Sequence, residues 1–295
     1  MNISYYPMSD RNAASSRLRV YKIADELTKL GHGVMFDKVS VDTHVVVVQK
    51  CYGLDTAIQN WRNAGIRVIF DVDDLIDLPI PDVDQITADT PYKVGKWPSA
   101  KVVPDCLDID SDSPFKDHHN DALKTAVYCA NADNIYHIAN ALEACRWVGV
   151  QLTIITDLTS PAVKEMYSKL NLNMGGVRLV QWKSTTVDAV MVEHDLVVCP
   201  FVYDGRWGRD WVESKSANKI LKAWALGLPC AGTGILSYLE AGLQHMAGSI
   251  DEWCEVLGEL EDPQVRFRDA ARGAQIANKY RADKVVNKWL EVMAG

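Results

Sequence analysis

Residues 195–234 read DLVVCPFVYDGRWGRDWVESKSANKILKAWALGLPCAGTG, and the order of elements in this stretch decides the fold class. The apolar run 196–199 stops at Pro200, which is typical of a buried strand. A loop rich in Trp, Arg and Gly follows, and then a helix that we expect to begin near Ser214 and to end at Gly227. A second apolar run comes next. Strand, loop, helix and strand form one unit of a parallel α/β sheet, and ligands of such sheets bind beyond the carboxyl ends of the strands.

The predicted helix has an apolar face and a basic face. Its apolar stripe, at helical spacing, consists of Ala217, Leu221, Trp224 and Ala225. Lys215, Lys219 and Lys222 recur at i, i+4 and i+7, so we predict that they share a second face. Residues 204–222 carry a net charge of +2 within a chain of net charge −8. Since backbone N–H groups at a helix start bind phosphate, these cations indicate a phosphate site, with a solvated lysine face as the simpler alternative.

Composition sets limits on the class of protein. The chain has 295 residues, 48% of them hydrophobic, and this length can form two ordinary domains. The net charge of −8 argues against a broad nucleic-acid-binding surface, although a local one is still allowed. The seven cysteines include no CxxC pair, and we find no metal-ligand spacing among Cys and His. With no signal-peptide pattern and no apolar run of ~18 residues, we expect a cytoplasmic protein without a transmembrane segment, whose oligomeric state is left open.

Strand and helix patterns alternate in two parts of the chain. In the first part we predict strands at residues 3–6, 34–36, 45–48 and 68–70, separated by helices. Residues 45–48 read VVVV, as expected of a strand buried on both faces of a sheet. Residues 77–121 contain six prolines and little periodicity, so we interpret them as loops and an interdomain linker with a short strand at 101–103. The alternation resumes at Ala126, which predicts two Rossmann-like halves.

Four motifs, in order along the chain, resemble those of GT-B glycosyltransferases. Residues 16–34 are similar to the first loop and helix of that family, with its "R…eL…GH.V" pattern. Residues 102–104 followed by Asp108 resemble "viPNgiD", although Asp-Cys replaces Asn-Gly. Residues 195–200 followed by KSANKILKAWALGLPCAGT resemble the nucleotide-sugar-binding signature, and residues 280–289 resemble the tail that crosses back to the first domain.

The resemblance implies an α/β fold with two Rossmann-like domains that face a cleft. We expect residues 1–110 to form the N-terminal acceptor domain and residues 111–277 to form the nucleotide-sugar donor domain. Residues 278–295 would form a C-terminal helix that packs back on the first domain. The first domain is shorter than is common in the family, so we expect part of its sheet to be missing.

The resemblance also implies the reaction, and we choose the residues that would perform it from their charge and their position at strand ends and helix starts. A sugar would pass from a nucleotide diphosphate-sugar, with UDP as the first choice, to an acceptor hydroxyl with retention of configuration, without a metal or other cofactor. The expected donor-binding residues are Arg206, Arg209, Lys215, Ser216, Asn218 and Lys219. The expected acceptor-binding residues are Ser16, Arg17, Arg19 and Asp71. The expected catalytic residues are Asp73, Asp74 and Arg209.

The chain departs from the family pattern at two points. Lys222 stands where the pattern usually has the glutamate that binds the donor ribose, and an ammonium cannot accept those hydrogen bonds. Ribose recognition would then come from elsewhere, for instance from Glu213 or Glu240. The segment AVYCANADN at residues 126–134 is not followed by the usual lysine of the family's basic pair, so the donor-binding cations named above would neutralise the diphosphate.

Several alternatives stay open. The aspartates of residues 71–74 are also compatible with the metal-binding Asp-x-Asp of single-domain GT-A transferases, whose activity would be lost in EDTA. The acceptor could be a glycan, a lipid-linked intermediate or a hydroxylated base in phage-type DNA. A non-catalytic nucleotide-sugar-binding protein, suggested by Lys222, and a sugar-nucleotide epimerase are further possibilities.

Overall fold

The computed structural model describes residues 1–73, 79–110, 112–116, 122–172, 176–203 and 208–295. The chain divides into two compact units. Unit 1 consists of Met1–Asp108, Ser214–Ser216 and Lys279–Gly295, and unit 2 consists of Ile109–Glu213 and Ala217–Asn278. The assignment of residues 214–216 to unit 1 is not among the features predicted from the sequence.

Unit 1 is built on a six-stranded parallel sheet with the strand order β2-β1-β3-β4-β5-β6. The strands are β1 (Asn2–Tyr6), β2 (Gly33–Phe36), β3 (Val45–Gln49), β4 (Arg67–Val72), β5 (Gln85–Ala88) and β6 (Lys101–Val102). The valine run of β3 is buried throughout and pairs with β1 on one side and β4 on the other, which confirms the predicted central strand.

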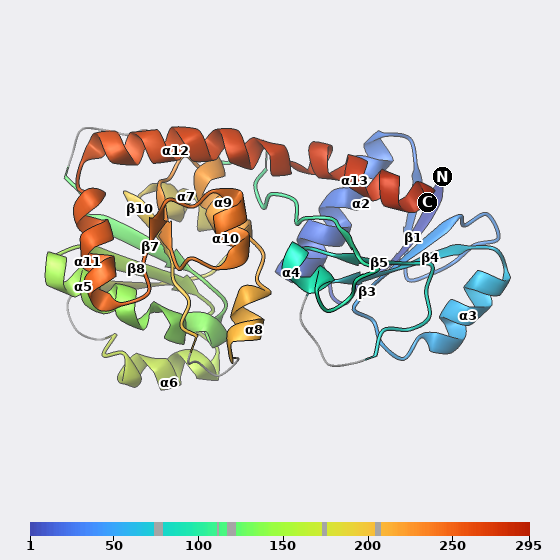
Figure 1. Cartoon of the computed structure of the whole chain (residues 1–295), viewed down its shortest axis with the longest axis horizontal. Coiled ribbons are helices and arrows are strands. Elements are labelled where there is room, and N and C mark those ends of the chain that lie inside the picture. Colours follow the sequence, from blue (N-terminus) through green and yellow to red (C-terminus); the bar gives the residue numbers. More distant parts are fainter. Residues whose placement is uncertain (74–78, 111, 117–121, 173–175, 204–207) are drawn as a thin grey trace. The chain divides into compact units, whose positions relative to one another are not determined.

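Helices cover both faces of this sheet (Figure 1). On one face lie α2 (Lys22–Lys29) and α13 (Ala282–Ala294), which share an apolar core with β1 and β3. The turn α1 (Ala14–Ser16) and the π-helical segment η1 (Arg17–Tyr21) lead directly into α2. On the other face, Ile58 of α3 (Asp55–Asn63) packs against β3 and β4. This arrangement follows from right-handed crossovers, because the chain moves in opposite directions along the sheet through α2 and through α3.

The interpretation of residues 77–121 as loops and a linker misses two short elements, whereas the predicted short strand at 101–103 is confirmed as β6. The missed elements are strand β5, which joins the unit 1 sheet between β4 and β6, and the short helix α4 (Pro91–Val94). The periodic signal is weak because β5 is short and one of its buried side chains is polar. Thr87 has no exposed surface, but its hydroxyl donates a hydrogen bond to Asp71 Oδ1 at 2.7 Å.

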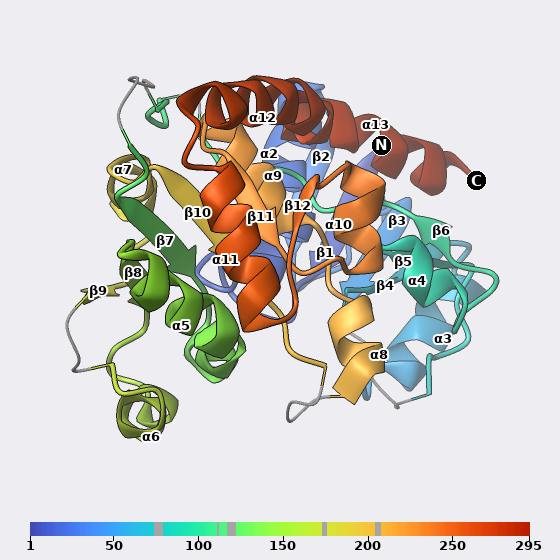
Figure 2. The same ribbon diagram turned by 60° about the vertical axis from the view of Figure 1, so that its left-hand side comes forward.

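Unit 2 contains a second six-stranded parallel sheet, with the order β12-β11-β10-β7-β8-β9. Its strands are β7 (Thr125–Cys129), β8 (Gln151–Thr156), β9 (Val177–Gln181), β10 (Leu196–Cys199), β11 (Cys230–Gly232) and β12 (His245–Met246). Helices α5 (Ala139–Val148) and α11 (Ile250–Glu259) pack on one face and are seen in front of the sheet in Figure 2. Helix α9 (Asn218–Ala225) follows β10 in the opposite direction along the sheet, which places it on the other face.

The remaining helices of unit 2 complete its layers. They are η2 (Ala132–Ile138), α6 (Pro161–Lys169), α7 (Val187–Val192), α8 (Gly208–Glu213), α10 (Leu236–Ala241), α12 (Pro263–Ala277) and η3 (Asn278–Tyr280). Helix α12 packs closely on α9, since a β-carbon added at Gly273 would lie 2.1 Å from Trp224 Cγ. The absence of a side chain at Gly273 thus allows Trp224 of α9 to lie directly against α12.

Candidate functional site

The strand order places a switch point in unit 2 at the carboxyl ends of β7 and β10. From β7 the chain continues through α5 to β8, whereas from β10 it continues through α9 to β11 on the other side. Crossover connections that leave in opposite directions open a crevice at the carboxyl edge of the sheet, and ligands of open α/β sheets bind there. This edge is therefore the first candidate for a ligand site.

Lys219, in the first turn of α9, lies at this switch point. Its Nζ is 5.3 Å from the centre of the Tyr128 ring in β7 and 5.4 Å from the Phe201 ring just after β10. The side chain is partly exposed, and among the described residues its ammonium has no hydrogen-bond or ion-pair partner. Loss of hydration lowers the pKa of Lys219. The aromatic faces attract the cation, but its hydrogen-bond donors are left for a ligand.

The loop after β10 is fixed from two sides. Phe201 N donates to Thr233 Oγ1 at 2.9 Å, and this hydroxyl donates in turn to Ala247 O at 3.2 Å. Val202 N donates to Nδ1 of His137 at 3.0 Å, and the His137 ring stacks on Trp211 with a centroid distance of 5.8 Å. The backbone that carries the Phe201 ring is thus held by hydrogen bonds from two sides. Sequence reasoning missed Tyr128, Phe201 and His137, although an aromatic residue directly after Pro200 was a usable signal.

The predicted helix with three lysines on one face is wrong. Helix α9 begins at Asn218, with Ala217 as N-cap, and Ser216 instead donates a hydrogen bond to Asp105 Oδ2 at 2.7 Å. Lys215 and Ser216 consequently belong to unit 1, and Lys219 belongs to unit 2.

Lys222 has a structural partner within unit 2. Its Nζ lies 2.7 Å from Asp188 Oδ1 on α7, and Asp188 Oδ2 also accepts a hydrogen bond from Ser113 Oγ at 2.8 Å. This ammonium therefore neutralises a neighbouring carboxylate. The ion pair gives a structural reason for lysine at the position where the family pattern has glutamate.

Two more of the predicted donor residues can be placed. Arg209 lies on α8 with 77% of its side chain exposed, 3.8 Å from Glu213 Oε1 and above the Tyr203 ring. Glu213, suggested for the ribose, already accepts hydrogen bonds from Leu236 N at 3.0 Å and from the Tyr203 hydroxyl at 3.1 Å. Asn218 is the partly exposed first residue of α9. Arg206 lies outside the described residues.

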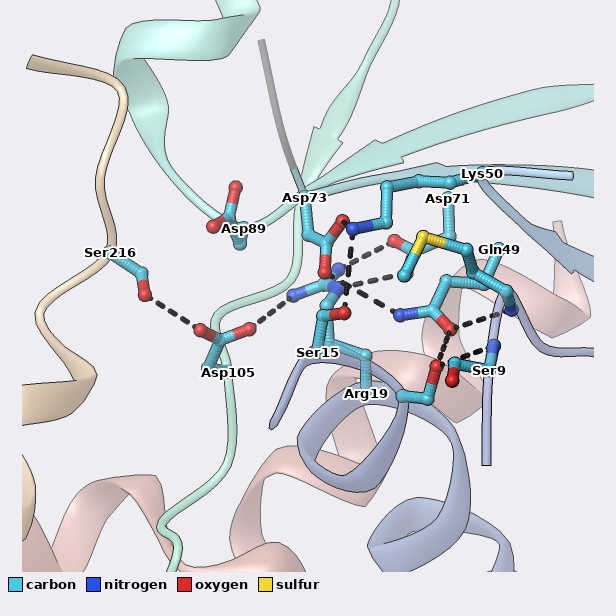
Figure 3. Close-up of polar contacts among 12 residues, drawn as sticks. Ser9, Ser15, Arg19, Gln49, Lys50, Asp71, Asp73, Asp89, Asp105 and Ser216 are labelled. Carbon is cyan, nitrogen blue, oxygen red and sulfur yellow. Dashed lines mark hydrogen bonds and ion pairs between the residues drawn. The ribbon is translucent and has the colours of Figure 1, made fainter. Parts of the chain in front are cut away.

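A cluster of buried charged side chains lies at the carboxyl edge of the unit 1 sheet (Figure 3). We call it the buried charge cluster, and its members are Arg19, Lys50, Asp71, Asp73, Asp89, Lys93 and Asp105. Lys50 directly follows β3, Asp71 lies in β4, Asp73 follows β4 and Asp89 follows β5. Because buried charges are costly unless they are paired, the partners within the cluster decide what each residue can do.

Arg19 holds the centre of the buried charge cluster. Its Nε and Nη2 donate to the two oxygens of Asp71 at 2.8 and 2.6 Å. Its Nη1 donates to Val103 O at 2.8 Å and to Asp105 Oδ1 at 3.1 Å. The side chains of Arg19 and Asp71 are both 0% exposed, and in this structure each is the other's ion-pair partner. Their assignment to acceptor binding stays a prediction.

Lys50 is held in an unusual backbone conformation. Its φ is +51°, a left-handed value that costs a non-glycine residue about 1–3 kcal/mol. Such a conformation persists only where the surrounding contacts impose it. Its Nζ lies 2.6 Å from Asp73 Oδ1 and 3.4 Å from Ser15 Oγ. Asp73 Oδ2 accepts a weak hydrogen bond from Gln49 Nε2 at 3.5 Å, and Gln49 Oε1 accepts one from Ser16 Oγ at 2.9 Å. The start of the first helix and the end of β4 are joined in this way.

The second lysine of the cluster, Lys93, forms an ion pair with Asp89 and donates a hydrogen bond to the backbone oxygen of Asp73. Burial raises the pKa of Asp89 to about 7. Arg17 lies outside the cluster and forms a two-point ion pair with Asp108, with both N–O distances 2.8 Å. Asp74, predicted to be catalytic, lies outside the described residues.

The described residues contain neither a metal-binding group nor a membrane-spanning helix. In the part of the chain that the structure describes, no group of three or more His, Cys, Asp or Glu side chains is arranged to hold a metal ion. No helix within the same ranges combines the length and the apolar character that crossing a membrane requires.

Comparison with known proteins identifies the fold. No protein-family model and no curated protein matches the sequence. The structure of Anabaena Alr3699/HepE in complex with UDP and glucose is similar, with a TM-score of 0.74 and 12% identity over 100% of both chains. Sucrose-phosphate synthase from Thermosynechococcus elongatus gives a TM-score of 0.71 and 11% identity over 100% of this chain and 98% of that one. The apo form of the lipopolysaccharide outer core galactosyltransferase WaaB gives 0.69 and 10%, over 100% and 99%.

Similarity at this level of identity establishes the architecture. It confirms the predicted α/β class with two Rossmann-like domains. The chain has the GT-B fold of glycosyltransferases.

Proposed function

We propose that this protein is a glycosyltransferase that moves a sugar from a nucleotide diphosphate-sugar to an acceptor hydroxyl. The observation that carries the proposal is Lys219, a partly desolvated ammonium without an ionic partner among the described residues, at the switch point of the unit 2 sheet. The GT-B fold supports the same reaction class. We infer UDP as the donor nucleotide because HepE, which is similar in structure, forms complexes with UDP and UDP-glucose.

The chemistry needed is stabilisation of the leaving nucleoside diphosphate. Negative charge builds up on its β-phosphate as the glycosidic bond breaks, and fixed cations and helix-start N–H groups stabilise such charge without reorganisation. Lys219 supplies the cation, and α9 begins at Asn218 without a side-chain cap. We assign both residues to the diphosphate. In this proposal no metal is required, because the lysine and the helix start supply the positive charge.

Arg206 and Arg209 are proposed to contact the donor diphosphate, Arg209 from α8. The high exposure of Arg209 leaves its guanidinium accessible to a phosphate oxygen, since its only described ion-pair distance is the long 3.8 Å contact with Glu213. Lys215 and Ser216, in the connection between α8 and α9, are proposed to contribute to donor binding.

Unit 1 is proposed to bind the acceptor through its carboxyl edge. Asp73 and Asp74 follow β4 directly and are the candidates for accepting the proton of the acceptor hydroxyl. The other predicted acceptor residues would support this edge without direct contact to the acceptor, because most of them are buried. They are Ser16, Arg19 and Asp71, which are buried, and Arg17. Retention of configuration is part of the proposal by resemblance to the family.

The test is thermal unfolding with UDP, GDP, ADP, dTDP and CMP, each with Mg²⁺ or with EDTA. A ligand at ~100 times its dissociation constant adds about 2.7 kcal/mol to the free energy of unfolding, so one nucleotide should raise the midpoint clearly. We expect UDP to do so equally in both conditions. Stabilisation that requires Mg²⁺ would favour the aspartates of residues 71–74 instead, and stabilisation by none of the nucleotides would contradict the proposal.

The Lys219→Met variant assigns the effect to the site. Methionine keeps the side-chain stem between the two rings but removes the charge, so the variant should fold and bind UDP roughly 10–100-fold more weakly. Lys169→Met is the control, because Lys169 lies exposed on α6 and its ion pair among the described residues is with the exposed Glu165, at 2.6 Å. Release of the sugar from UDP-sugar, by hydrolysis or transfer, separates a transferase from a protein that only binds the donor.

A further inference from the structure

Asp105 joins two parts of unit 1 with its two oxygens. Oδ1 accepts a hydrogen bond from Arg19 Nη1 at 3.1 Å, and Oδ2 accepts one from Ser216 Oγ at 2.7 Å (Figure 3). The aspartate is only 8% exposed, so water competes little for either oxygen. A carboxylate can accept from both partners at once, whereas an asparagine at this position, as in the family pattern, has one acceptor oxygen.

The Arg19 end of this connection is fixed. Arg19 is held by both oxygens of Asp71, by Val103 O and by Asp105, and its side chain is fully buried. Thr87 on β5 donates to the same Asp71 carboxylate. The position of Asp105 Oδ2 is thereby determined by the sheet of unit 1.

The Ser216 end leads directly to the proposed donor site. Ser216 is followed by Ala217, the N-cap of α9, and Lys219 is three residues further along the chain. Since α9 has no side-chain cap of its own, the residues just before it determine how its first turn is entered. Within this connection, the side chain of Ser216 is hydrogen-bonded to Asp105 of the buried charge cluster.

We propose that Asp105 and Ser216 form a positioning pair, which fixes the entry to α9 and so places Lys219 for the donor diphosphate. The inference rests on the proposed function for the identity of the ligand but not for the structural effect. Neither residue needs to touch the donor. Loss of the pair should leave the chain folded and should weaken donor binding, because the first turn of α9 would sample more orientations.

The chain offers a matched control for Ser216. Ser113 Oγ donates to Asp188 Oδ2 at 2.8 Å, and Asp188 is in turn paired with Lys222 at 2.7 Å, so a serine again bonds to an ion-paired carboxylate. We expect Ser216→Ala to raise the KM for the UDP-sugar about tenfold with kcat changed less than threefold. Ser216→Thr, which keeps the hydroxyl, should restore the KM, and Ser113→Ala should leave it unchanged. An unchanged KM in Ser216→Ala, or an equal rise in Ser113→Ala, would overturn the proposal.

Asp105→Asn tests the other half of the pair. Asp105→Asn leaves one acceptor oxygen for two donors, Arg19 and Ser216. The part of its effect on KM that acts through Ser216 should be absent once Ser216 is alanine, so the double variant should raise KM by less than the product of the two single effects. Effects that multiply independently would contradict a positioning pair.

A readout without donor keeps this inference separate from the proposed function. Hydrogen exchange of peptides that cover residues 208–225 should become faster in Ser216→Ala and stay unchanged in Ser113→Ala, with exchange in β8 as internal reference. If the wild type binds no nucleotide but exchange responds as expected, the proposed function fails and the structural part of the pair stands. If the wild type binds UDP and exchange does not respond, the positioning pair fails alone.

Discussion

Replacing Arg19 by methionine tests whether the buried charge cluster stabilises unit 1. Arg19 makes two hydrogen bonds to Asp71, at 2.6 and 2.8 Å, and one each to Val103 O and Asp105, at 2.8 and 3.1 Å. Its guanidinium also lies 5.5 Å from the ring centre of Trp289 on α13. The variant leaves the Asp71 carboxylate buried without its cation.

The expected loss can be estimated from burial. Both side chains of the Arg19–Asp71 pair are 0% exposed, and removing one partner of such a pair costs about 3–5 kcal/mol, mostly for the uncompensated charge left behind. For a chain of this size each kcal/mol lowers the thermal midpoint by roughly 2–4 °C, so a fall of roughly 6 °C or more is expected. Arg19→Lys keeps the charge but loses the two-point geometry and should fall between the variant and the wild type.

The assay is urea denaturation followed by tryptophan fluorescence, with hydrogen exchange in β3 and β4 to locate the change. Arg11→Met is the control, because Arg11 forms the same two-point contact with Asp25 but the two side chains are 57% and 48% exposed. Exposed pairs contribute about 0–1 kcal/mol. A loss below about 1 kcal/mol for Arg19→Met, or equal losses for the two variants, would refute the reasoning.

Three further predictions concern packing and titration. Gly273→Ala should destabilise the chain by about 1–3 kcal/mol, because the new β-carbon would lie 2.1 Å from Trp224 Cγ. Gly258→Ala places its β-carbon in open space and should stabilise the helix by about 0.5–1 kcal/mol. Thermal unfolding of the two variants measures both effects. Burial raises the pKa of Asp89 from 3.8 to about 7, so its contribution to the free energy of unfolding should be lost as pH rises through that range. Asp89→Asn should flatten the dependence in urea titrations at pH 5 and pH 8, and an unchanged slope would contradict the assignment. Burial lowers the pKa of His194 below 6.5, so its contribution to the free energy of unfolding is present above pH 6.5 and should be lost on acidification. Urea denaturation at pH 7.5 and pH 5 should show a smaller loss in His194→Asn than in the wild type.

The central strands and most helices could be predicted from the sequence because their signals are local. The valines of β3 and the run Leu196–Cys199 of β10 are buried on both faces, and such runs are visible without any partner. Strand β5 could not be predicted in this way, since the hydroxyl of its buried Thr87 is hydrogen-bonded to Asp71 on the neighbouring strand, a partner that is distant in the sequence.

The candidate site was predictable in part. The basic character of residues 215–222 was visible, and Lys219 does lie at a carboxyl edge. The helical spacing of Lys215, Lys219 and Lys222 suggested one face, but α9 begins only at Asn218. Ser216, just before this start, is hydrogen-bonded to Asp105, a residue 111 positions away, which no local pattern indicates.

The sequence by itself determined the alternation of strands and helices, and with it the α/β class, because hydrophobic periodicity and helix-stop residues act over a few neighbouring positions. Only the tertiary structure decided which charges neutralise one another and which has no ionic partner among the described residues. Arg19 meets Asp71 across 52 positions and Asp105 across 86, whereas Lys219 meets aromatic rings. Such pairings depend on strand order and crossover direction, which bring distant carboxyl ends to one edge of a sheet.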